Sequence, residues 1–180
     1  KVVIDNSPVK LSGDRMDVRV RETNLGNAVA DALLDYGQSD FTHKSNLAVT
    51  NGGGLRETIA KDKPITKGDI IAVLPFGNSV AQIQVTGQNI YDMFVKSLGS
   101  ILQVNESGKN VFDENGQPLL EPSGGFLQVA GARVYYDTTL PTEKRILSID
   151  ILDPETGVYK PLNTTETYYL VTNDFLACWW

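Results

Sequence analysis

The most informative stretch of this sequence is Leu47-Ala48-Val49-Thr50-Asn51-Gly52-Gly53-Gly54-Leu55-Arg56. Its first four residues predict a short buried strand. The strand runs into three glycines, which carry no β-carbon, so a ligand can approach the main chain and the N–H groups can face an anion. Arg56 adds a planar guanidinium that suits phosphate. The alternative interpretation is a tight turn between a strand and a helix, followed by a surface arginine.

The segments around this stretch predict both helices and strands. A helix is expected after Thr23 or Asn24, either of which can cap it, with Gly37 as its left-handed stop. A second helix is expected after Thr86. Strands are expected at 47–50, 69–74, 81–85, 126–136, 146–152 and 167–172.

The remaining segments complete the predicted fold. Residues 153–157 are typical of a hairpin turn, and residues 105–125 of a long loop. The sequence shows no internal repeat and no domain boundary, so residues 1–180 are expected to form a single domain. Two helices with about six strands, some of them consecutive, indicate an α+β fold with a mixed β-sheet packed against a few helices.

Composition excludes several classes of partner. The net charge is −6, which argues against binding to nucleic acid or to an anionic membrane. No apolar stretch reaches the roughly 18 residues of a membrane span, so no membrane insertion is expected. Two or three arginines can still build a local positive pocket for a small anion. Cys178 is the only cysteine and forms no internal disulfide.

Two further motifs suggest ligand contacts. In Arg19-Val20-Arg21, an extended backbone would place both arginines on one face and Val20 toward the core. The alternative is a solvated edge strand. Phe76, expected at the end of a strand, can stack on a base, which is worth about 1–3 kcal/mol. Asn78 can bind the edge of a base. The alternative for Phe76 is a ring that caps the core.

Taken together, these motifs resemble the C-terminal domain of the 5'-nucleotidase family. Four segments carry the resemblance, in order along the chain: 19–27, 51–56, 74–78 and 172–177. The family includes bacterial UDP-sugar hydrolases, animal ecto-5'-nucleotidases and bacterial surface nucleotidases that produce adenosine. The resemblance implies the fold of that domain and a secreted, cell-surface or periplasmic location.

The resemblance also implies roles for individual residues. Arg19 and Arg56 would contact the phosphate of the ligand, and Phe76 and Phe175 would sandwich its base. The expected ligand is a nucleotide or nucleoside such as AMP or adenosine. Charge-assisted contacts to phosphate are worth roughly 1.5–3 kcal/mol each.

Two asparagines complete the substrate-binding residues that the resemblance implies. Asn78 would meet the edge of the base, and Asn51 would line the pocket. Arg21 is a weaker candidate, because family members vary at this position. Beyond Ala177 the family continues with a Gly-Gly-Asp-Gly motif that holds the ribose, whereas this sequence has Cys178-Trp179-Trp180 and reads as a piece of a longer protein.

No catalytic residue and no metal ligand is expected in this chain. His43 is the only histidine, and it is expected in an exposed loop without further ligands around it. The resemblance implies that hydrolysis of nucleoside phosphates uses two divalent metal ions, held by an N-terminal metallophosphatase domain of the same parent chain. This chain would supply substrate recognition and would be inactive alone.

Two other functions stay open. A non-catalytic surface module that binds a protein or a glycan would keep the fold and lose the site; the acidic surface and the missing Gly-Gly-Asp-Gly motif favour it. A Rossmann-type cofactor domain rests only on the glycine run, which lacks the G-x-G-x-x-G spacing.

Overall fold

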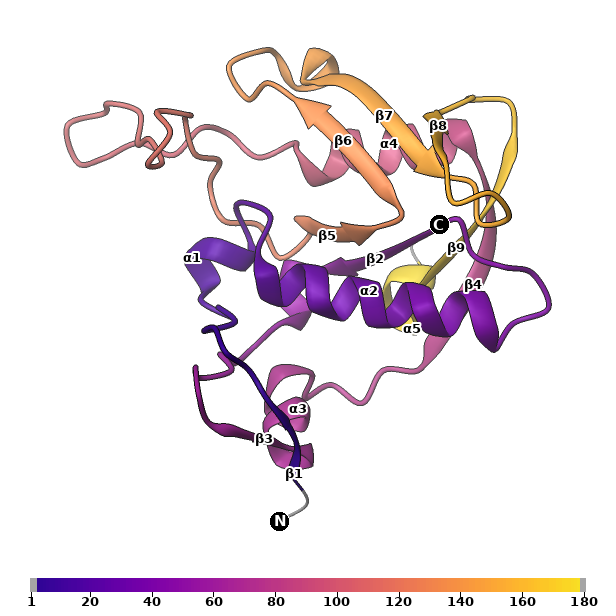
Figure 1. The fold of residues 1–180 in the computed structure, drawn as a ribbon. Helices are drawn as coiled ribbons and strands as arrows, with labels where there is room; N and C mark the ends of the chain where they lie inside the picture. The colour runs from indigo at the N-terminus through magenta and orange to yellow at the C-terminus, as the bar shows by residue number, and fades with distance from the viewer. Residues whose placement is uncertain (1–2, 179–180) are drawn as a thin grey trace.

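The computed structural model describes residues 3–178, which are arranged in three layers (Figure 1). The middle layer is a four-stranded sheet, and a single helix covers one face of it. A second sheet and a further helix cover the other face. The middle sheet has the order β4 (Val80–Thr86), β9 (Thr167–Asn173), β2 (Leu47–Asn51), β5 (Leu127–Ala130). Strands β9 and β2 are parallel and the other pairs antiparallel, so the predicted α+β fold with a mixed sheet is confirmed.

Strand β2 lies at the centre because it is apolar on both faces. Every one of its residues is buried. Leu47 and Val49 face α4 (Gly87–Ser97) and the second sheet, whereas Ala48 faces α2 (Asn24–Ser39). Its apolar start, Leu47 to Val49, suits a strand that is covered on both sides.

The second sheet is antiparallel and consists of β6 (Ala132–Tyr136), β7 (Ile146–Leu152) and β8 (Tyr159–Pro161). The single strand predicted at 126–136 is wrong, because Gly131 divides it into β5 and β6. Gly131 has a φ of +72° and packs against the carbonyl of Asn46, where a β-carbon would clash. The chain therefore leaves one sheet at this residue and enters the other. The hairpin turn predicted at 153–157 joins β7 to β8.

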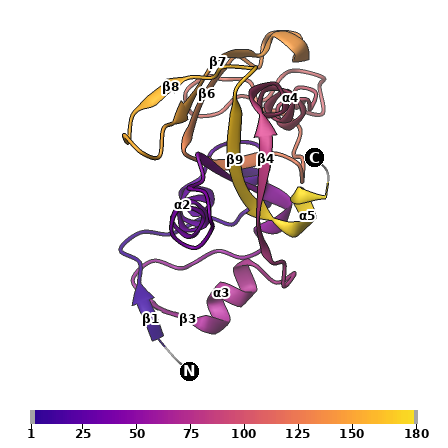
Figure 2. The same cartoon turned by 90° about the vertical axis from the view of Figure 1, so that its right-hand side faces the viewer.

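A small lobe is formed by β1 (Val3–Asn6), β3 (Pro64–Thr66), α3 (Lys67–Val73) and α1 (Arg15–Val18), with β1, β3 and α3 at its far end (Figure 2). The strand predicted at 69–74 is wrong, since α3 occupies this segment. Thr66 and Asp69 form a capping box at its start, which satisfies the first backbone N–H groups of a helix. The capping box makes this segment a helix, because its apolar residues alone follow neither a clear helical nor a clear strand periodicity.

Helix α2 begins as predicted, with the Thr23 side chain accepting a hydrogen bond from the N–H of Gly26. Its predicted end at Gly37 is wrong, because the helix continues to Ser39. A β-carbon on Gly37 would lie 2.6 Å from both Ser45 Oγ and Val171 Cγ1. Gly37 therefore allows close packing of the helix on the sheet.

The predicted long loop projects from the body as an arm, defined as residues 101–121 (Figure 1). The arm contains two turns of the same form, one closed by Asn105 with Gly108 and the other by Asp113 with Gly116. In each turn the Asn or Asp side chain accepts backbone N–H groups, and the glycine has a positive φ. The sequence does contain a short repeat, Asn105-Glu106-Ser107-Gly108 and Asp113-Glu114-Asn115-Gly116.

Two remaining expectations concern single residues. His43 lies in an exposed loop, as predicted, and its ring stacks on Tyr169 with centroids 4.3 Å apart. Trp179 and Trp180 lie outside the described residues. Within residues 3–178, the structure contains no helix of the length and apolar character that crossing a membrane requires.

Two glycines with the same backbone conformation allow a direct test of the sheet-to-sheet crossing. Gly157 has a φ of +71° and open space around it, whereas Gly131 packs against backbone. Gly157→Ala should lower the free energy of unfolding by about 1–2 kcal/mol, the cost of the left-handed conformation. Gly131→Ala should cost about 1–3 kcal/mol more, because the chain must also move apart. Urea unfolding measures both, and equal losses would contradict the close contact at Gly131.

Candidate functional site

A pocket of about 670 Å³ opens where β2 and β9 end. Four of the six residues predicted for substrate binding line it: Asn51, Phe76, Asn78 and Phe175. They meet because β4 and β9 pair antiparallel, with Val80 opposite Asn173. This register places the segment before β4 beside the segment after β9, where α5 (Asp174–Ala177) begins.

Both phenylalanine rings are unusually exposed. Phe76 is 59% exposed and Phe175 is 52% exposed, and both line the pocket. Phe76 is therefore not a ring that caps the core, which was the alternative interpretation. Exposed aromatic rings that face one cavity offer apolar surface and stacking geometry to a planar ligand.

The two asparagines differ in how they are held. Asn51 is 8% exposed, and its side-chain Nδ2 donates to the carbonyl of Gly124 at 3.1 Å. Its Oδ1 accepts a weaker bond from Asn173 at 3.4 Å. Asn51 thus fixes the wall that residues 123–125 form. Asn78 is exposed at the rim of the pocket.

The glycine run serves the packing of the chain on itself. Gly52 packs against the backbone of Val18 and Arg19, where a β-carbon would clash with the Val18 carbonyl. The N–H of Gly52 donates to Phe126, and that of Gly53 donates to Gly124. These two N–H groups therefore bind protein carbonyls, and the expectation that they face an anion is wrong. Gly53 and Gly54 nevertheless line the pocket.

The other two predicted residues, Arg19 and Arg56, are not among the residues that line the pocket, but Arg56 lies beside it and acts electrostatically on Arg19. The guanidinium carbon of Arg56 lies 5.7 Å from the centre of the Phe76 ring. Arg19 is partly buried, and its Nε is buried without a hydrogen-bond partner among residues 3–178. Burial, and then the positive charges of Arg15 and Arg56, lower the pKa of the Arg19 guanidinium. An anion placed here would give the Arg19 Nε an acceptor and would offset the repulsion from Arg15 and Arg56.

Arg15 was missed by the sequence reasoning. It lies in α1, one helical turn before Arg19, and contributes to the same positive field. The signal was its four-residue spacing from Arg19, which only matters once the segment is helical. The extended backbone predicted for Arg19-Val20-Arg21 is wrong, since α1 and a turn occupy this region; Val20 is nevertheless buried as expected, and Val18 is buried too.

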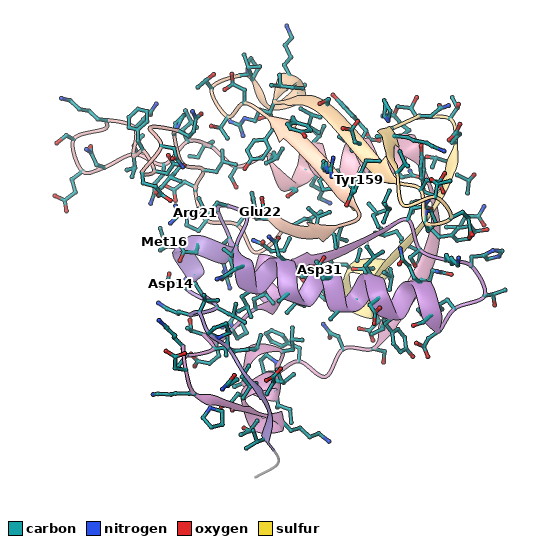
Figure 3. All side chains as sticks on the ribbon, viewed as in Figure 1. Asp14, Met16, Arg21, Glu22, Asp31 and Tyr159 are labelled. Carbon is teal, nitrogen blue, oxygen red and sulfur yellow. The ribbon has the colours of Figure 1, made fainter. Side chains whose placement is uncertain are left out.

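Arg21 does not belong to this arginine group. Its guanidinium binds Asp17 at 2.6 Å and Glu114, on the arm, at 2.9 Å. Hydrogen bonds to Asp17 and Glu114 raise the pKa of Arg21, and the bond from Arg21 lowers the pKa of Asp17. Figure 3 shows Arg21 between α1 and the arm. Arg21 is therefore neutralised and connects the arm to the body.

Other residues of the pocket wall carried no sequence signal. Met93, Lys96 and Ser97 come from the last turns of α4. The hydroxyl of Ser97 accepts the N–H of Leu127 at 2.9 Å, which joins α4 to the edge strand β5. These positions follow the ordinary pattern of an amphipathic helix, so only the fold reveals that they border a cavity.

Metal binding finds no support in this part of the molecule. Among residues 3–178, no group of three or more His, Cys, Asp or Glu side chains is placed to hold a metal ion. The pocket's own side chains offer stacking, hydrogen bonding and positive charge.

Comparison with known proteins identifies the family. The model of the 5'-nucleotidase C-terminal domain matches residues 3–178. The chain belongs to this family. It is 34% identical over 169 residues to the trifunctional nucleotide phosphoesterase protein YfkN of Bacillus subtilis, covering 94% of this chain and 10% of that protein. It is 29% identical over 177 residues to human 5'-nucleotidase, covering 94% of this chain and 28% of that protein.

A solved structure of the family agrees with the fold. The 5'-nucleotidase precursor from Thermus thermophilus has a TM-score of 0.73 to this chain and is 34% identical to it, covering 97% of this chain and 30% of that one. This chain thus spans less than a third of the length of these relatives.

The ion pair between Arg21 and Glu114 should hold the arm and leave the arginine group unchanged. Arg21→Gln is expected to raise amide hydrogen exchange in residues 105–118 by up to about fivefold, the range of a solvent-exposed ion pair. Glu114→Gln should give the same increase, and the double variant should add little to either. Arg19→Gln serves as the control and should leave exchange in the arm unchanged. A similar increase in that control would contradict the separate roles.

Proposed function

We propose that this chain is the nucleotide-recognition part of a metal-dependent 5'-nucleotidase, in which Phe76 and Phe175 hold the base and arginines hold the phosphate. One observation carries the proposal. Two exposed rings from distant parts of the sequence line one pocket, and a guanidinium lies against one of them. A ligand that is planar at one end and anionic at the other satisfies both features.

The base end of the proposed site is apolar. A base between Phe76 and Phe175 would cover ring surface that is otherwise in water. Stacking of a base on an aromatic side chain is worth about 1–3 kcal/mol. Asn78, exposed at the rim, can donate to and accept from the edge of the base. Asn51 acts indirectly, since it fixes the wall at Gly124.

The phosphate end of the proposed site is cationic. The positive charges of Arg15 and Arg56 act on Arg19, whose guanidinium is also partly buried. The buried Nε of Arg19 has no acceptor among residues 3–178. A phosphate group with several acceptor oxygens supplies both the charge and the lone pairs.

Hydrolysis itself belongs to a part of the protein that precedes this domain. The metal ions of 5'-nucleotidases sit in the N-terminal domain, and residues 3–178 offer no ligand group for them. When bound there, two divalent ions would activate a water molecule and stabilise the leaving oxygen. The residues of this chain would bind the nucleoside phosphate and present it. The corresponding role of the whole protein would be nucleotide catabolism outside the cytoplasm, and the name of one relative, snake venom 5'-nucleotidase, supports such a location.

The two rings provide the first test. Phe76→Ala and Phe175→Ala should each weaken AMP and adenosine binding by roughly 5- to 150-fold, because each removes one stacking partner. Isothermal titration calorimetry on this chain measures both ligands. Phe112→Ala is the matched control, since this ring is 55% exposed on the arm and should leave binding unchanged. If the ring variants bind as the unmodified chain does, the base lies elsewhere.

The arginines provide the second test. Arg56→Gln and Arg19→Gln should each weaken AMP binding by about 10- to 150-fold and leave adenosine binding nearly unchanged, because adenosine has no phosphate. Arg21→Gln is the control, as this side chain is already paired with Asp17 and Glu114. Equal losses for AMP and adenosine would assign the arginines to structure.

A second candidate function rests on a different surface of the molecule. Helix α3 exposes Ile70 and Ile71, and Leu74 follows them. This apolar face would suit a surface module that binds another protein. A chain that responds to neither AMP nor adenosine in the titrations would favour this alternative.

A further inference from the structure

Gln128 is a buried polar residue that no sequence motif singled out. It lies in β5 opposite Thr50 and is 1% exposed. A buried side-chain amide has two donors and one acceptor oxygen to satisfy, and leaving them unpaired is costly. Among residues 3–178, the hydrogen bonds of the Gln128 amide all go to one segment, residues 18–23.

The geometry of these contacts is specific. Nε2 of Gln128 donates to the carbonyl of Val18 at 3.0 Å and to that of Arg21 at 2.7 Å. Its Oε1 accepts the N–H of Thr23 at 3.0 Å, with the Thr23 hydroxyl at 3.5 Å. One amide therefore joins the end of α1 to the start of α2.

These partners lie on both sides of Arg19. The Val18 carbonyl precedes Arg19 and the Arg21 carbonyl follows it, so Gln128 fixes the turn that carries the guanidinium. The space for this amide is reserved by Gly26, where a β-carbon would clash with Gln128 Oε1. The backbone of the same turn is also held by the N–H of Ser123, which donates to the Arg19 carbonyl at 3.0 Å.

Arg19 needs such support because its surroundings repel it. The charges of Arg15 and Arg56 act on it, and its Nε is buried without a partner among residues 3–178. A turn that could shift would let the guanidinium move away from its neighbours. Binding groups lose much of their effect when they are displaced by even about 1 Å.

We propose that Gln128 is a positioning residue, which holds Arg19 in the orientation that binds the phosphate of the ligand. The ligand in this statement rests on the proposed function. The positioning itself rests on the four contacts between the Gln128 amide and residues 18–23. Gln128 is not among the residues that line the pocket, so it would act through Arg19.

A double-mutant cycle tests the coupling to phosphate. Gln128→Met removes every hydrogen bond at similar length, and Gln128→Glu keeps the acceptor for Thr23 while removing the donor to Val18 and Arg21. In this chain, each should weaken AMP binding by about 10-fold or more, approaching the loss caused by Arg19→Gln. Adenosine binding should change by less than about twofold. In the Arg19→Gln background, neither variant should weaken AMP binding further.

Asn46→Leu is the matched control for a purely structural effect. Asn46 is also a bridging amide, which accepts the N–H of Tyr169 and donates to the Leu152 carbonyl at the other end of β2. Its loss should lower stability and leave the ratio of AMP to adenosine affinity unchanged. A ratio that falls equally in Asn46→Leu and Gln128→Met would overturn the positioning role. Additive losses in the double-mutant cycle would overturn it as well.

An NMR measurement without ligand separates this proposal from the proposed function. The Nε–H signal of Arg19 should shift or broaden in Gln128→Met and in Gln128→Glu, and should stay in place in Asn46→Leu. An unchanged Arg19 signal in a folded Gln128 variant overturns the positioning role, whatever the chain binds. If the unmodified chain binds no AMP while the Arg19 signal responds as expected, the proposed function fails and the positioning of Arg19 stands.

Discussion

The site depends on a close approach between two backbones. Gly52 packs against Val18 and Arg19 without space for a β-carbon, and the N–H of Gly53 donates to the carbonyl of Gly124. Three segments that are distant in sequence are thus joined at the end of β2. This contact brings together the turn that carries Arg19, the pocket wall at residues 123–125 and the end of β2. A side chain at Gly52 would separate them, because backbone atoms have little freedom to move aside.

The arginines near this contact have two different roles. The whole chain carries −6, yet the positive charges of Arg15 and Arg56 both act on Arg19. Arg21, only two residues from Arg19, is neutralised by Asp17 and Glu114. The fold therefore separates one arginine that stabilises structure from a group whose repulsion an anion would relieve. Net charge alone argues against nucleic acid as a partner and says nothing about this local field.

Much of the sheet could be predicted from sequence because β2 starts with an apolar run and β4 alternates apolar with polar residues. Two errors in the fold share a cause. In each case a residue outside the predicted strand decides its conformation: Thr66 for residues 69–74, and Asn46 for residues 126–136. The apolar run at 69–74 becomes a helix through the cap at Thr66, and Gly131 divides a strand because a neighbouring carbonyl occupies the space of a side chain. Gly37 illustrates the same limit, as close packing on Val171 explains it better than a helix stop.

The pocket itself was less accessible to sequence reasoning. Motifs and the family resemblance indicated Phe76 and Phe175, but the antiparallel register of β4 and β9 brings them to one end of the sheet. Side-chain roles depended further on local conformation. An extended backbone would have placed Arg19 and Arg21 together, whereas helix α1 and the turn after it place Arg19 with Arg15. Gln128 gave no signal, because a buried glutamine is recognised only through its partners.

The cationic end of the pocket is held by more contacts than the aromatic end. At the cationic end, the turn that carries Arg19 is fixed by Gln128, by Ser123 and by the packing of Gly52. At the aromatic end, Phe76 belongs to an exposed loop whose Gly77 has a φ of +63° and open space around it. Phe76 also lines another cavity, of about 140 Å³, together with Leu33 and Val80. In the proposed function, the phosphate would meet a preformed group of charges, and the base would meet a ring that can adjust to it. Discrimination between ligands with and without a phosphate would then come from the rigid end, because only groups held in place keep their full electrostatic effect.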